Sequence, residues 1–247
     1  MTTEPVRAAA EFVSHRLREQ PRTPKGDGHS VILFPGLGSN GTALLPLLKY
    51  CRSLGYDALD WGRGVNTGPS GDIDLWLEDL SHDVLNLIGD DGRYATLVGW
   101  SLGGLYAREL GKKMSSRVRQ VITMGTPFNG TAQNTNVGWL YTLLNRSASA
   151  PDRRLLSRLR TPPPVPTTSI YSRGDGVVAW QACLHQRSPG LVEDVEVTGS
   201  HIGMGWNRDV HAVVADRLMQ KPGKWRPYRA TSPGDVEAAS SRAVTSS

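Results

Sequence analysis

The chain has 247 residues, of which 38% are apolar, and this length and composition predict one α/β domain with a sizeable core rather than two small domains. The net charge of +5 is modest, and no run of about five or six basic residues is interleaved with aromatics, so nucleic acid is not an expected partner. Glu4, Arg7 and Glu11 interrupt the apolar core that a signal peptide needs, and no segment reaches about eighteen apolar residues, so we expect a soluble cytoplasmic protein. Cys51 and Cys183 are too few for a disulfide framework and lack metal-ligand spacing, which favours buried thiols over a single disulfide.

Apolar residues alternate between helix-like and strand-like spacing along the chain. The chain opens with an amphipathic helix whose apolar face carries Val6, Ala9, Val13 and Leu17. Strands are predicted at residues 31–34, 56–61, 95–98, 118–124, 167–171 and 194–197, and helices at 73–88, 102–112 and 210–218. This alternation predicts a mainly parallel central sheet with helices on both faces.

Three segments stand apart from the alternating pattern. Residues 1–27 form the opening helix and a linker, which leaves residues 28–229 as the α/β domain. Within that domain the alternation stops at about residues 127–166, and we predict an insertion that forms a cap or lid over the sheet. Residues 230–247 have almost no apolar content and are predicted to be a disordered tail.

The stretch VILFPGLGSNGTALL, residues 31–45, combines a strand, a glycine-rich turn and the start of a helix. Its Gly36-x-Gly38-x-x-Gly41 pattern has the spacing of a dinucleotide fingerprint, and Asp60 ends the next strand, where an acid would hold a ribose hydroxyl. A chain with 27 glycines contains this pattern by chance about 0.3 times. The same strand and turn can instead supply an oxyanion donor to a serine hydrolase, so the rest of the site decides.

The nucleophile candidate is Ser101 in VGWSLGG, residues 98–104. It follows the strand YATLV and precedes a helix, and such a sharp turn lifts a serine off the end of the sheet. Gly99 and Gly103 are small enough to let the neighbouring chain pack closely. The amide of Leu102, at the helix N-terminus, is the first expected oxyanion donor. The alternative is a serine that only caps the helix.

A nucleophilic serine needs a base that an acid orients. His201 lies in the loop after the strand DVEVTG, and Asp175 lies in a glycine-flanked turn after the preceding strand. The chain order of serine, acid and histidine matches that of a known hydrolase arrangement. His185 is the alternative base, and Asp194 or Asp209 are alternative acids.

Five segments together resemble the α/β-hydrolase superfamily, within it the bacterial lipase and esterase-like branch: FPGLGS, GWSLGG, TMGTPFNG, YSRGDGVVAW and GSHIGMGWN. The resemblance runs from about Val31 to Leu218. It implies that the amide of Leu37 is the second oxyanion donor. It also places Ile202 where relatives are expected to carry a cysteine, which argues against a disulfide from Cys183.

The resemblance implies a serine hydrolase that cleaves carboxylic esters through an acyl-enzyme, with Ser101 as nucleophile, His201 as base and Asp175 as the orienting acid. No metal or organic cofactor is expected, and the substrate is a small-molecule or lipid ester. A thioesterase or acyltransferase would use the same triad. An NAD(P)-dependent oxidoreductase and a non-catalytic binding protein of this fold are the remaining alternatives.

Within the insertion, residues 139–144 are mostly apolar and could line an acyl pocket, form a lid with transient membrane-surface contact, or be ordinary core. Five arginines follow them, and a solvated helix face is favoured over binding of lipid headgroups or of an acyl-carrier phosphate; these are Arg146, Arg153, Arg154, Arg158 and Arg160.

Overall fold

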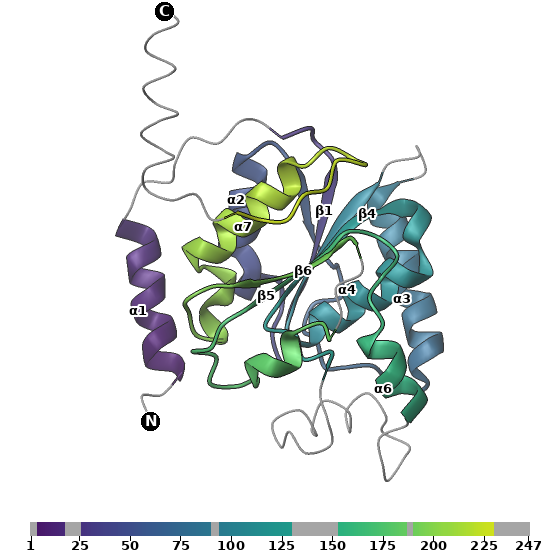
Figure 1. Cartoon of the computed structure of the whole chain (residues 1–247), viewed down its shortest axis with the longest axis horizontal. Helices are drawn as coiled ribbons and strands as arrows, with labels where there is room; N and C mark the ends of the chain where they lie inside the picture. Colours follow the sequence, from purple (N-terminus) through teal and green to yellow (C-terminus); the bar gives the residue numbers. More distant parts are fainter. Residues whose placement is uncertain (1–3, 18–25, 90–93, 130–152, 187–189, 230–247) are drawn as a thin grey trace, which may run out of the picture.

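The computed structural model describes residues 4–17, 26–89, 94–129, 153–186 and 190–229. Six strands in these residues form one sheet in the order β2-β1-β3-β4-β5-β6, and every neighbouring pair is parallel. The strands are β1 Ser30–Phe34, β2 Asp57–Asp60, β3 Ala95–Trp100, β4 Val118–Met124, β5 Thr167–Tyr171 and β6 Val192–Glu196. The predicted parallel α/β architecture is confirmed (Figure 1).

Helices cover both faces of the sheet (Figure 1). On one face lie α2 (Leu45–Ser53) and α7 (Arg208–Met219), and on the other lie α3 (Ile73–Ile88), α4 (Leu102–Lys113) and α6 (Arg153–Arg160). Strand β1 is buried on both sides, because Val31 and Leu33 join the first layer and Ile32 and Phe34 the second. Short 3-10 turns complete the chain: η1 Gly41–Leu44, η2 Ser115–Arg117, η3 Trp180–Cys183 and η4 Ile202–Gly205.

Helix α1 spans Glu4–Leu17 at the start of the chain. On the apolar face predicted from the sequence, Val6 is 62% exposed and Ala9 is also exposed, while the side chains of Val13 and Leu17 lie outside the described part of the chain. The helix instead contacts the loops after β5 and β6 through polar groups, including the Trp206 indole, which donates a hydrogen bond to the Ala8 carbonyl at 3.0 Å. Val6 and Ala9 therefore do not lie on the side of α1 that contacts these loops.

The predicted insertion is described only in part, since residues 130–152 lie outside the described ranges, as does the predicted tail. The part that follows contains α6, whose Leu155 and Leu159 pack into the core beside α4. Arg158 of α6 forms ion pairs with Asp74 at 2.5 Å and with Glu109 at 3.1 Å. Among the described residues, no helix combines the length and apolarity needed to cross a membrane.

Helix α4 begins in very close contact with the strand ends. A Cβ atom at position 99 would overlap the backbone of Gly103, and one at position 103 would overlap the carbonyl oxygen of Phe34 and lie 2.6 Å from that of Pro35. A Cβ atom at position 104 would likewise overlap Thr126. Only glycine allows this approach, so the first turn of α4 packs directly on the ends of β1 and β3.

A buried arginine connects α4 to α6 and β6. Arg108 is fully buried, and its guanidinium donates to His185 Nε2 at 2.8 Å and to the Leu159 carbonyl at 3.3 Å. Because arginine has no acceptor, His185 must accept at Nε2 and carry its proton on Nδ1, which donates to Asp194 at 2.6 Å. Burial lowers the pKa of Arg108 to about 9, so the guanidinium stays charged at neutral pH.

Two details of this region differ from what the sequence indicated. Asp194 was expected to begin a strand, but β6 starts at Val192 and pairs it with Thr167, which places Asp194 in the middle of the strand. His185 was the alternative catalytic base, but its Nε2 is already bound to Arg108. The pair is therefore part of a buried connection between helix and strand.

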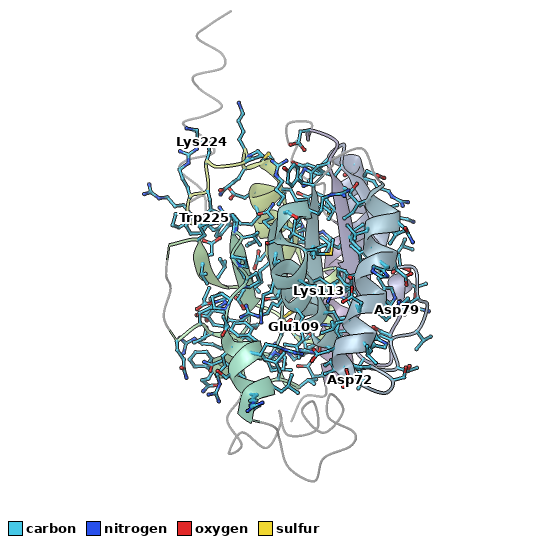
Figure 2. The ribbon with its side chains drawn as sticks, turned by 90° about the vertical axis from the view of Figure 1, so that its right-hand side faces the viewer. Asp72, Asp79, Glu109, Lys113, Lys224 and Trp225 are labelled. Atoms are coloured by element: carbon cyan, nitrogen blue, oxygen red, sulfur yellow. The ribbon has the colours of Figure 1, made fainter. Side chains whose placement is uncertain are left out.

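Replacing Gly103 with alanine should destabilise the fold, because the added methyl group meets backbone carbonyls that cannot rotate away. We expect the free energy of unfolding in urea to fall by about 2 kcal/mol or more, despite the helix propensity of alanine. Lys113→Ala is the control: Lys113, labelled in Figure 2, is exposed at the end of α4, where it forms an ion pair with the exposed Glu78, and its loss should change stability by no more than about 1 kcal/mol. Equal effects of the two substitutions would contradict the close packing.

Burial also lowers the pKa of His185, so its neutral imidazole takes up a proton less readily in the folded protein than in the unfolded chain. The resulting stability is present above the ordinary histidine pKa of about 6.5 and is lost as the pH falls below it. Between pH 7.5 and 5.5 we expect wild type to lose about 1 kcal/mol more unfolding free energy than His185→Gln does. The exposed His82→Gln should behave like wild type. The same pH dependence in all three proteins would contradict this assignment.

Candidate active site

Ser101 lies between β3 and α4 with φ 54° and ψ −119°, and it is the one non-glycine residue with positive φ among the described residues. A conformation of this kind costs about 1–3 kcal/mol and persists only when its surroundings hold it. Here the Ser101 amide donates to the Met124 carbonyl at 2.9 Å, and the Ser101 carbonyl accepts from the Gly104 amide at 3.1 Å. The Ser101 side chain makes no capping hydrogen bond to α4, which argues against a purely capping role.

Asp175 and His201, on the loops after β5 and β6, are in direct contact. His201 Nδ1 lies 2.6 Å from Asp175 Oδ2, and the side chains are 5% and 2% exposed, respectively. The other carboxylate oxygen of Asp175 accepts from the amides of Val177 and Val178 at 2.9 and 2.7 Å. One oxygen of the Asp175 carboxylate is thus held by the backbone of its own turn, and the other orients the imidazole of His201.

Contacts between loops bring Ser101 and His201 to the same edge of the sheet. Trp100, which precedes Ser101, donates its indole N–H to the His201 carbonyl at 3.1 Å, and the two rings lie 5.6 Å apart. A Cβ atom on Gly125, after β4, would lie 3.0 Å from His201 Nδ1. A Cβ atom on Gly36, after β1, would lie 3.3 Å from the Cβ of Ser101. Four strand ends therefore converge on the serine and the histidine.

The turn after β1 is held by Asn66, a residue that the sequence analysis missed. This fully buried side chain donates to the Pro35 carbonyl at 2.8 Å and accepts from the Tyr106 hydroxyl at 3.1 Å. The backbone carbonyl of Asn66 accepts from the Gly38 amide at 2.8 Å. In sequence, Asn66 looks like any polar loop residue, so nothing marked it. It fixes the backbone on both sides of Leu37.

The two expected oxyanion donors, the amides of Leu37 and Leu102, lie in the turn after β1 and at the start of α4. Leu37 belongs to the turn that packs on Ser101 through Gly36, and Leu37 is 37% exposed. Leu102 is the first residue of α4, so its amide is one of the N–H groups that have no acceptor inside the helix. Both amides come from backbone that is fixed independently of any substrate.

The glycine turn does not have the form that a dinucleotide site requires. In such a site the helix starts at the turn and its free N–H groups face the pyrophosphate. Here α2 starts only at Leu45, and the intervening 3-10 turn is capped by the side chain of Asn40. Asp60 packs against Gly41, where a Cβ atom would lie 2.6 Å from its carboxylate, and burial raises its pKa. These contacts favour the oxyanion interpretation.

The remaining candidate residues lie elsewhere. Asp209, the second alternative acid, is exposed in the first turn of α7. Cys51 and Cys183 are both free and buried, and burial raises the pKa of Cys51 to about 12. Within the described part of the chain, no three or more histidine, cysteine, aspartate or glutamate side chains are placed to hold a metal ion.

Comparison with known proteins agrees with this architecture. The chain is 30% identical over 137 residues to the biotin biosynthesis bifunctional protein BioHC of Teredinibacter turnerae, an alignment that covers 51% of this chain and 23% of that protein. A pimeloyl-(acyl-carrier protein) methyl ester esterase of Shewanella woodyi is 26% identical over 102 residues, 41% of this chain and 37% of that protein. The chain thus spans well under half the length of these curated relatives.

The fold is also found in solved structures. The crystal structure of Paleococcus ferrophilus monoacylglycerol lipase superimposes with a TM-score of 0.58 at 12% identity, over 82% of this chain and 99% of that chain. The model of the alpha/beta hydrolase family matches residues 31–237, from β1 to beyond the end of α7. Because this match covers most of its length, the chain belongs to the alpha/beta hydrolase family.

Proposed function

We propose that this protein is a serine hydrolase that cleaves carboxylic esters through an acyl-enzyme. The observation that carries the proposal is the buried hydrogen bond between His201 and Asp175, at the edge of the sheet where Ser101 occupies its strained turn. A nucleophile, a base and an orienting acid are the three groups that such chemistry needs.

The hydrogen bonds of the histidine define its tautomer. A carboxylate only accepts, so in neutral His201 the proton is on Nδ1 and Nε2 carries the lone pair. In the proposed reaction Ser101 Oγ attacks the ester carbonyl while His201 takes its proton, and His201 returns it to the leaving alcohol. Water then attacks the acyl-enzyme by the same route, and Asp175 stabilises the imidazolium in both steps.

The amides of Leu37 and Leu102 are the proposed donors to the oxyanion. Each such donor stabilises the transition state by about 3 kcal/mol. The positive end of the α4 dipole adds to this stabilisation. Since Asn66 and the glycine contacts hold both segments, the donors are in place before the substrate binds.

The comparisons favour an ester as the substrate. Two of the sequence relatives are named as methyl ester esterases that act on a pimeloyl group carried by acyl-carrier protein. We infer from them an ester with an aliphatic acyl chain, either as a small molecule or as a lipid. Thioester hydrolysis and acyl transfer would use the same residues and are tested alongside.

Ser101→Ala should lower kcat for p-nitrophenyl esters by at least about 10⁴-fold, because the acyl-enzyme can no longer form. The control is Ser116→Ala, an exposed serine beyond α4, which should keep wild-type activity. Acyl chains of increasing length show the preferred substrate, and a fluorophosphonate should label wild type but not Ser101→Ala. Full activity in Ser101→Ala would contradict the proposal, and labelling without ester turnover would direct the assay to thioesters.

Asp175→Asn should lower kcat by about 10⁴-fold, because an amide that donates to His201 imposes the wrong tautomer. Asp209→Asn is the matched control, since Asp209 is the exposed alternative acid, and it should leave kcat within about twofold of wild type. If Asp209→Asn were the inactive variant, the acid would have been assigned to the wrong residue.

A further inference from the structure

Helix α1 contacts both loops that carry the proposed acid and base. It is the first element of the chain, yet it lies beside the loops that follow β5 and β6 (Figure 1). Its contacts to these loops are made mainly by three charged side chains, Glu4, Arg7 and Glu11.

Two of these side chains bind on both sides of Asp175. Arg7 Nη1 donates to the carbonyl of Gly174, the residue before Asp175, at 2.5 Å. Glu4 Oε1 accepts from the amide of Gly176, the residue after it, also at 2.5 Å. The backbone on either side of the proposed acid is thus held by α1.

The same arrangement occurs around His201. Glu11 accepts from the amide of Ser200, the residue before His201, at 2.8 Å and from its hydroxyl at 3.1 Å. The second oxygen of Glu4 lies 3.4 Å from the amide of Ile202, the residue after it. Glu4 therefore connects the acid loop directly to the base loop.

The spacing of the three residues suits this task. Positions 4, 7 and 11 follow the i, i+3, i+7 pattern, so their side chains leave one face of the helix. Hydrogen bonds with one charged partner are about twice as strong as those between neutral groups. A Cβ atom on Gly203 would overlap the carboxylate of Glu11, so the base loop needs glycine there to admit the helix.

We propose that Glu4, Arg7 and Glu11 are positioning residues that hold Asp175 and His201 in register for catalysis. This inference rests on the proposed function of that pair. The acid and the base come from separate loops, and their productive geometry tolerates a displacement of only about 0.5 Å. Helix α1 supplies a rigid bridge between those loops, outside the sheet that carries them.

Glu11→Ala and Glu4→Ala should each lower kcat about 10- to 100-fold with KM within about twofold, because misplacement of about 1 Å costs up to about 10²-fold in rate. Glu11→Gln keeps an acceptor oxygen and should recover most of the activity. Val6→Ala, at an exposed position of the same helix, is the control. Rates are expressed per active site titrated with fluorophosphonate, so that partial unfolding does not lower the apparent kcat.

A purely structural role for α1 would lower the unfolding free energy and the number of active sites but leave kcat per site unchanged, and that result would overturn the proposal. A second measurement does not depend on turnover. The proton shared by His201 and Asp175 should give a downfield NMR resonance that is absent from Asp175→Asn and broadened or lost in Glu11→Ala. If that resonance is perturbed while wild type hydrolyses no ester, the proposed function fails but the positioning does not. An unperturbed resonance in Glu11→Ala overturns the positioning.

Discussion

The position of Ser101 depends on how closely α4 approaches the ends of β1 and β3. Glycine at positions 99 and 103 removes the side chains that would separate these elements. The chain therefore turns from β3 into α4 at a single residue, Ser101. Ser101 takes a positive φ, and its amide donates a hydrogen bond to the Met124 carbonyl of the neighbouring strand. The strain at Ser101 is thus offset by packing that extends well beyond the turn. The glycine turn after β1 is placed against Ser101 by the same contacts.

Buried charged groups connect the elements that carry the site. Helix α4 begins at the proposed nucleophile and β6 leads to the proposed base, and Arg108 joins the two through His185 and Asp194. A neutral imidazole between guanidinium and carboxylate lets both charges be buried while each remains hydrogen-bonded. On the outside of the sheet, α1 connects the acid and base loops through its own charges. Polar contacts of this kind have direction, so they can set the orientation of a loop as well as its place.

Local patterns predicted most of the fold. Hydrophobic periodicity located all six strands and α3, α4 and α7, because each of these buries a regular face against the sheet. The close-packed elbow around Ser101 and the order of the proposed acid and base were visible too, since short glycine-rich motifs mark the strand ends. In α1 the contacts to the loops are made by charged side chains, whereas the apolar Val6 is exposed.

By itself, then, the sequence determined the parallel α/β sheet and a short set of candidate residues at its edge, because strands, helices and tight turns are specified by neighbouring residues. Only the tertiary structure decided which candidates meet. It paired Asp175 with His201, bound His185 to Arg108, and placed Asn66 under the turn at Pro35. It also brought Glu4 to Ile202, which is 198 positions further along the chain. Such contacts depend on how several elements pack at once, and no local spacing records that geometry.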